Sequence, residues 1–168
     1  FVQARLNSSR LKDKVIKKIN NKTLIEILLK RLSKSKLVDK VVVLIPEEKN
    51  ENELEKLIKE KGFEVFRGNK NNVLDRFYKA SKKYKSHYII RITADCPLVD
   101  VNIIDKLIKI IIKKKYNYVS NTSPATFPDG LDAEIFTTKI LHHTWKKAKT
   151  KYDKEHVTPF MIRSKSKK

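Results

Sequence analysis

Glycine is scarce in this sequence, whose 168 residues include only Gly62, Gly68 and Gly130. Three glycines so far apart can form neither the GxGxxG fingerprint of dinucleotide-binding folds nor the GxxxxGK motif of P-loop enzymes. A phosphate-binding loop in this protein must therefore depend on side chains and on a turn that needs no glycine.

Cysteine is even rarer, because Cys96 is the only one. A single cysteine excludes a disulfide framework and a CxxC pair for zinc or redox chemistry. We interpret Cys96 as a small packed residue rather than a nucleophile. The histidines show no metal-ligand spacing with it; they are His87, His142, His143 and His156.

Long apolar runs are also missing. No segment approaches the roughly 20 apolar residues of a membrane-spanning helix, and the first residues lack the pattern of a signal peptide. We therefore expect a cytoplasmic protein without a membrane partner. We expect residues 1–168 to form a single domain, cut at both ends, because Phe1 opens the chain in mid-strand without an initiator Met.

Acidic residues are outnumbered, with 19 Asp and Glu against 39 Lys and Arg, and the formal net charge is +20. Such a charge favours nucleic-acid binding when the cations are clustered. Here only seven of the cations are Arg, and Lys is spread over nearly every expected helix surface. We therefore expect no dedicated nucleic-acid partner, and we expect residues 163–168, RSKSKK, to be a frayed end.

The sequence does contain an alternation of strand and helix patterns. Strands are predicted at 1–4, 41–45, 63–66, 87–93 and 116–120, and helices at 24–32, between Asn50 and Gly62, at 73–84 and at 101–115. A capping box from Thr23 to Glu26 supports the first helix. Asn50 is the expected N-cap of the second helix, and Gly62 is its expected C-terminal stop. The alternation predicts an α/β fold with three layers and a mostly parallel sheet.

The last third of the chain changes character. We expect residues 126–136, TFPDGLDAEIF, to leave the main sheet and to include a short apolar strand. A helix containing Trp145 is expected after Thr138, and another from Asp153 that Pro159 interrupts.

Polar and charged residues follow three of the predicted strands. Ligands of parallel sheets collect outside the carboxyl ends of the strands, which places the Arg5–Lys14 loop, the Arg67–Arg76 segment and Asp95 at one edge. Asp13 tolerates the left-handed conformation and is able to supply the turn of the loop. The loop is then either a triphosphate-binding site or a solvated basic loop; its polar residues are Arg5, Ser8, Ser9, Arg10 and Lys14.

Six ordered blocks carry a resemblance to a known family. They are QARLNSSRLKDKVI, FRGNKNNVLDRFYKA, RITADCPLVD, YVSN, FPDGLDAEIF and EHVTPF. Together they resemble the spore-coat polysaccharide biosynthesis protein F family, cytidylyltransferase-like proteins related to the synthetases of CMP-activated acidic sugars. The resemblance runs from Phe1 to about Ile162, and Lys12 and Asp13 replace the Pro-Gly of the family's opening motif.

The resemblance implies a nucleotide-diphospho-sugar transferase-like, mononucleotide-binding fold. It implies coupling of a nucleoside triphosphate, with CTP favoured, to a sugar or sugar acid with release of pyrophosphate. It assigns Arg5, Arg10 and Lys14 to the triphosphate, beside Ser8 and Ser9. On the base and ribose side it suggests Ala4, Arg67, Gly68, Asn72, Arg76 and Ala94.

Asp95 is the first candidate for a Mg²⁺ ligand, since hard oxygen donors suit that ion. The alternative is a helix cap before Pro97. Asp132 and Glu134 are candidates for the metal shell or for holding the sugar, and the alternative is a solvated turn. Further candidates for sugar contact are Asn121, Asp129 and His156. Asp129 beside Gly130 is better explained as turn chemistry, and a lone His near a helix that Pro interrupts is more often structural.

The expected mechanism is in-line attack by a sugar oxygen on the α-phosphorus, with Arg10, Lys14 and Asp95 as the catalytic group. No general base stands out; Asp132 or Glu134 is nearest. Two alternatives stay open: a glycosyltransferase that uses a nucleotide sugar, although no DxD motif surrounds Asp95, and a non-enzymatic basic nucleic-acid-binding domain. A homodimer is also considered.

Overall fold

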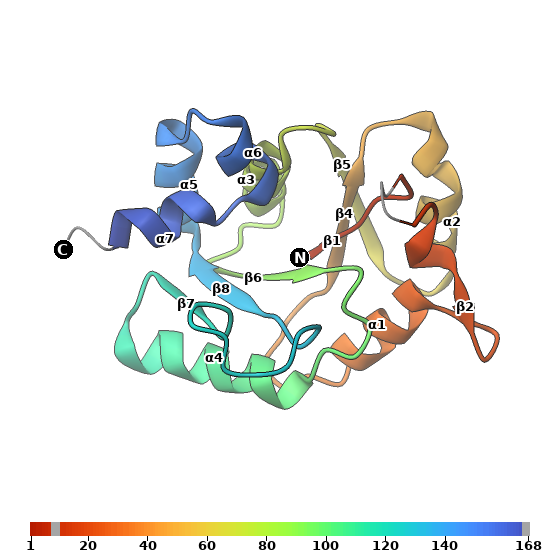
Figure 1. Ribbon diagram of the computed structural model, residues 1–168, viewed down its shortest axis with the longest axis horizontal. Helices are drawn as coiled ribbons and strands as arrows, with labels where there is room; N and C mark the ends of the chain where they lie inside the picture. Colours follow the sequence, from red (N-terminus) through yellow and green to blue (C-terminus); the bar gives the residue numbers. More distant parts are fainter. Residues whose placement is uncertain (8–10, 166–168) are drawn as a thin grey trace.

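The computed structural model of the chain describes residues 1–7 and 11–165. Within that part, a six-stranded sheet has the order β5-β4-β1-β6-β8-β7 (Figure 1). The strands are β1 (Val2–Gln3), β4 (Val42–Pro46), β5 (Glu64–Gly68), β6 (Tyr88–Thr93), β7 (Tyr118–Ser120) and β8 (Glu134–Thr137). A separate hairpin is formed by β2 (Lys18–Ile19) and β3 (Lys22–Thr23).

The strands β5, β4, β1 and β6 run parallel to one another. The short β1 lies in the middle, with Val2 opposite Val43 on one side and Ile92 on the other. Every residue of β4 is buried, as expected for a continuous β-branched run that is covered on both faces. The predicted mostly parallel sheet is confirmed.

The strand β8 corrects the prediction that residues 126–136 leave the main sheet. Glu134–Thr137 pairs antiparallel with β6 along one edge and with β7 along the other. Ile135 and Phe136 are completely buried on opposite faces of the sheet, one in each half of the core. This short run therefore buries more apolar surface between β6 and β7 than it would outside the sheet.

Helices cover both faces of the sheet (Figure 1). One face carries α1 (Leu24–Leu32), α2 (Asn52–Glu60) and α4 (Val101–Lys114), which pack on Val2, Val43 and Ile92. The other face carries α3 (Val73–Lys83), α5 (Thr138–Lys147), α6 (Lys151–His156) and α7 (Pro159–Lys165). The predicted three layers are confirmed. No helix in the described ranges is long and apolar enough to cross a membrane.

The predicted helix ends are partly confirmed. Thr23 Oγ1 accepts the Glu26 N–H at 3.3 Å, and the Glu26 carboxylate accepts the Thr23 N–H at 2.6 Å, which completes the capping box. Gly62 ends the next helix with a φ of 80°. Asn50 is not its N-cap, because a 3-10 turn, η2 (Lys49–Glu51), precedes α2 and no side chain caps that start.

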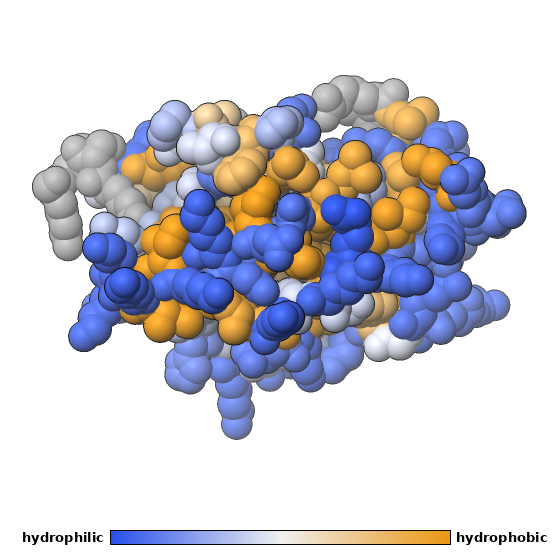
Figure 2. Space-filling view, turned by 90° about the horizontal axis from the view of Figure 1, so that it is seen from below, coloured by the Kyte–Doolittle hydropathy of each residue, from blue (hydrophilic) through white to orange (hydrophobic). Residues whose placement is uncertain are grey.

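An apolar groove of about 540 Å³ lies at the amino ends of β4 and β6. Figure 2 shows apolar surface framed by hydrophilic side chains on the underside of the molecule. Leu37, Tyr88 and Ile112 line the groove and are partly exposed. The Phe1 amino group donates to the Ile90 carbonyl at 2.7 Å and also lies at this groove.

Candidate active site

A cleft of about 180 Å³ opens at the carboxyl ends of β1 and β6. It brings together the opening loop, the segment before and within α3, and the end of β6, as predicted from the strand order. Its lining residues are Gln3, Ala4, Arg5, Lys14, Val15, Lys70, Val73, Arg76, Thr93, Ala94 and Asp95.

The centre of the cleft is an ion pair between residues 81 positions apart. Lys14 Nζ lies 2.9 Å from Asp95 Oδ2, and the two side chains are 24% and 37% exposed. Burial opposes ionisation of Asp95, but hydrogen bonds from Lys14 and Thr93 outweigh it and lower the pKa of the carboxyl. Asp95 is therefore ionised at neutral pH and accessible to a ligand.

The turn that presents Lys14 depends on Asp13. Asp13 adopts the left-handed conformation, with φ 55° and ψ 25°, immediately before the 3-10 turn η1 (Lys14–Ile16). Its N–H donates to the Leu6 carbonyl at 3.1 Å, which closes the loop. The expectation for Asp13 is confirmed. Arg5 is exposed at the cleft, whereas Ser8, Ser9 and Arg10 lie outside the described residues.

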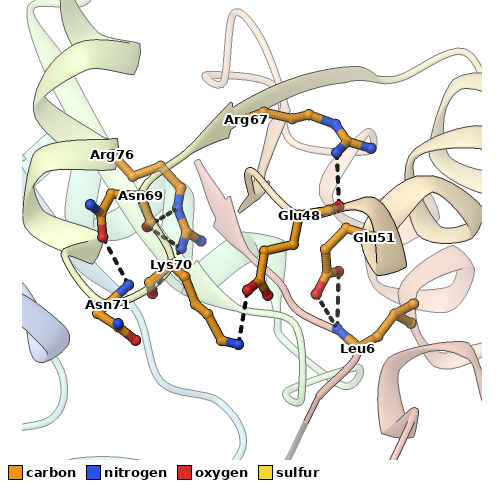
Figure 3. Close-up of polar contacts among 8 residues, drawn as sticks. All are labelled: Leu6, Glu48, Glu51, Arg67, Asn69, Lys70, Asn71 and Arg76. Carbon is orange, nitrogen blue, oxygen red and sulfur yellow. Dashed lines mark hydrogen bonds and ion pairs between the residues drawn. The ribbon is translucent and has the colours of Figure 1, made fainter.

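Glu51 supports the other end of this loop, and no sequence pattern predicts this role. Both Glu51 carboxylate oxygens accept the Leu6 N–H, at 3.2 and 3.1 Å (Figure 3). The residue is 1% exposed, and burial raises the pKa of its carboxyl. A buried carboxylate that binds a backbone N–H is undetectable in the sequence, because Glu51 lies in a charged segment resembling solvated surface.

The buried side chain of Arg76 forms part of the cleft wall. Its guanidinium donates to the backbone carbonyls of Asn69 and Lys70, at distances from 2.7 to 3.2 Å (Figure 3), and to that of Leu44 at 3.3 Å. The residue is 2% exposed, and burial lowers the pKa of the guanidinium to about 10. A Cβ atom at Gly68 would lie 2.9 Å from Arg76 Cγ, so this glycine allows the close approach.

The other residues predicted for the base and ribose divide into two groups. Ala4 and Ala94 line the cleft. Arg67 instead donates to Glu55 and Asn52, at 2.7 and 2.6 Å, and to the Glu48 carbonyl. Asn72 caps α3 by accepting the Asp75 N–H. Neither they nor Gly68 line the cleft, because their polar atoms are used in local structural contacts.

The acidic candidates lie near the strand ends on the β8 side. Burial and the negative charges of Asp129, Glu134 and Asp95 raise the pKa of Asp132. The repulsion between the carboxylates of Asp95 and Asp132 fits a divalent cation, because a cation held by both would relieve that repulsion. Among the described residues no three His, Cys, Asp or Glu side chains are close enough to form a complete protein cage for a metal.

The predicted sugar contacts lie in different surroundings. Glu134 is buried between Tyr118 and Arg91, which donate to it at 2.6 and 2.5 Å. The Asn121 side chain bonds the backbone at Leu131 and Ala133, so it fixes the segment before β8.

His156 ends α6 with its ring 4.6 Å from that of Tyr152. It is exposed and does not line the cleft.

Comparison with known proteins gives the family. A model described as cytidylyltransferase matches residues 1–167. The chain is 44% identical to an uncharacterised protein of Methanocaldococcus jannaschii, over 96% of this chain and 65% of that protein. It is 31% identical to the spore coat polysaccharide biosynthesis protein SpsF of Bacillus subtilis, over 84% of this chain and 59% of that protein.

A solved structure agrees with these relatives. The cytidylyltransferase of Leptospira borgpetersenii superposes with a TM-score of 0.95 and 33% identity, over 99% of this chain and 71% of that one. The chain spans about 65% and 59% of the two curated relatives. From its first strand to its last helix, the chain belongs to the cytidylyltransferase family.

Proposed function

We propose that this protein is a nucleotidyltransferase that couples CTP to a sugar or sugar acid and releases pyrophosphate, for surface polysaccharide or glycan biosynthesis. The observation that carries the proposal is the Lys14–Asp95 pair at 2.9 Å, which joins a cationic loop to the end of β6 within one cleft. The family supports CTP as the nucleotide.

Arg5 and Lys14, with Arg10 from the adjoining segment, bind the triphosphate in this proposal. Two unit charges about 4 Å apart interact by roughly 4 kcal/mol at an effective dielectric of 20, so converging cations stabilise the charge that develops on pyrophosphate. Lys14 supplies a mobile charge to the leaving group.

Asp95 and Asp132 would hold Mg²⁺, whose chemistry is to neutralise phosphate oxygens and orient the phosphates. Their oxygen donors and mutual repulsion fit such an ion. Before substrate binds, Asp95 holds Lys14 at the cleft. The ion pair between Lys14 and Asp95 thus positions both the positive and the negative side chain of the triphosphate site.

The reaction forms a bond between an acceptor oxygen and the α-phosphorus and breaks the bond from that phosphorus to the bridging oxygen of the leaving pyrophosphate. A carboxylate or phosphate acceptor needs no general base. For a hydroxyl acceptor, no general base stands out among the described residues, because Asp132 would be a metal ligand and Glu134 already accepts from Tyr118 and Arg91.

The first prediction concerns this site. With Mg²⁺ and a panel of sugar acids and sugar phosphates, we expect pyrophosphate release with CTP in preference to UTP, GTP and ATP. Lys14→Ala and Asp95→Ala should each lower kcat/KM by about 100-fold or more, because each removes a charge at the reacting phosphates. A coupled pyrophosphate assay measures both effects.

Lys17→Ala and Asp39→Ala are matched controls, since both residues are exposed and outside the cleft. They should retain full activity. Transfer from a nucleotide sugar without pyrophosphate would establish the glycosyltransferase instead. Steeply salt-dependent binding of nucleic acid that Asp95→Ala leaves unchanged, with no turnover, would support the basic binding domain.

A further inference from the structure

Four polar side chains cross the sheet in a continuous series toward the cleft. Tyr118 on β7 donates its hydroxyl proton to Glu134 on β8 at 2.6 Å, and Arg91 on β6 donates to the other Glu134 oxygen at 2.5 Å. Arg91 also donates to Gln3 Oε1 on β1 at 3.2 Å. The series occupies four neighbouring strands and ends on a residue that lines the cleft.

The inner part of this series is buried. Glu134 is 6% exposed and Tyr118 is 7% exposed. Burial, followed by the negative charge of Glu134, raises the pKa of Tyr118, so its hydroxyl stays protonated and can donate. A buried ion pair often stabilises a protein less than apolar residues of the same volume would. Stability alone is therefore a weak reason for this arrangement.

The orientation of Gln3 follows from its neighbour. A guanidinium only donates hydrogen bonds, so Gln3 must turn its oxygen toward Arg91 and its NH₂ group away. No hydrogen bond among the described residues uses Gln3 Nε2, although Gln3 lines the cleft beside Lys14 and Asp95. Arg91 Nε is also without a hydrogen-bond partner in the described part of the chain. The series thus leaves a fixed donor at the cleft.

The position of the Gln3 NH₂ group indicates which of the two substrates, the nucleotide or the acceptor, it would contact. Gln3 pairs in register with Thr93 of β6, and its oxygen points to Arg91 on the same strand. That is the side of β1 on which the acidic residues near β8, the candidates for sugar contact, lie. The start of α3, with Val73 and Arg76, borders the cleft from another element and contributes no hydrogen bond to Gln3.

We propose that Gln3 is a substrate-binding residue that donates from its NH₂ group to an oxygen of the sugar or sugar-acid acceptor, and that Arg91, Glu134 and Tyr118 are positioning residues that fix its orientation. The inference rests on the proposed function. It moves Glu134 from direct sugar contact to an indirect role.

The test separates the two substrates. Gln3→Met keeps the length of the side chain but removes the donor, so the KM for the acceptor should rise about 10- to 100-fold. The Kd for CTP, measured by calorimetry with Mg²⁺, should stay within about twofold. Tyr118→Phe should raise the acceptor KM less, in the same direction, with kcat nearly unchanged. Gln3→Asn, which keeps the NH₂ group, should recover part of the loss.

Several outcomes would overturn the inference. An acceptor KM within twofold of the wild type in folded Gln3→Met would show that the amide makes no such contact. A parallel rise in the Kd for CTP would assign Gln3 to the nucleotide. If the wild-type chain releases no pyrophosphate with any acceptor, the proposed function fails and the inference fails with it, whereas an active wild type with unaffected variants removes the inference alone.

Discussion

Glu51 carries a carboxylate in a position that is 1% exposed, and both of its oxygens accept one backbone N–H, that of Leu6. Residues 6 and 13 are in turn joined by the hydrogen bond from the Asp13 N–H to the Leu6 carbonyl. The left-handed turn that presents Lys14 is thereby fixed to η2 through single side-chain and backbone contacts.

A substitution tests this support. Glu51→Ala leaves the buried Leu6 N–H without an acceptor and should lower the free energy of unfolding by about 1–3 kcal/mol. Glu51→Gln retains an acceptor oxygen without the buried charge and should recover most of the loss. Urea denaturation at pH 7 measures both variants. Glu53→Ala, an exposed neighbour at the start of α2, serves as control; an equal effect of both alanine variants would contradict the assignment.

Single residues show how far the sequence determines the site. The edge of the sheet, Lys14, Asp95 and the turn at Asp13 were predictable, because strand order and residue type determine them. The roles of Arg67 and Arg76 were not, because a motif does not specify which neighbours satisfy a guanidinium. Gln3 was missed because its orientation depends on Arg91, 88 residues away.

At the scale of elements, α1 is joined to the segment that carries Lys14 across the β2-β3 hairpin. Leu24 N–H donates to the Lys17 carbonyl at 3.0 Å, which joins the start of α1 to the end of η1. The capping box of Thr23 and Glu26 fixes the same helix start. The position of α1 and the position of the loop that carries Lys14 are therefore coupled.

Removal of the cap should be measurable. Thr23→Ala removes the hydroxyl that accepts the Glu26 N–H and should lower the free energy of unfolding by about 1 kcal/mol. Thr23→Ser keeps a hydroxyl and should lose much less. Thermal or urea denaturation distinguishes the two variants, and equal stabilities would show that the cap contributes nothing.

The elements also show where pattern reasoning ends. Three features are predicted correctly because each depends on residues that are close in the sequence. They are the capping box, the end of α2 at Gly62 and the alternation of strands and helices. The place of β8 depends on pairing with β6, whose residues lie more than 40 positions earlier. The four residues of β8 do not by themselves indicate which strands of the sheet they pair with.

At the scale of the whole molecule, the central place of β1 bears on the order of events during synthesis. Val2 and Gln3 leave the ribosome before both of their partner strands, β4 and β6, and β6 ends only at Thr93. The strand β1 therefore has an unpaired edge until β6 has been synthesised, and β8 joins the sheet later still. Nascent chains that have not yet reached Thr93 expose strands with open edges, a state in which chaperones bind and aggregation begins.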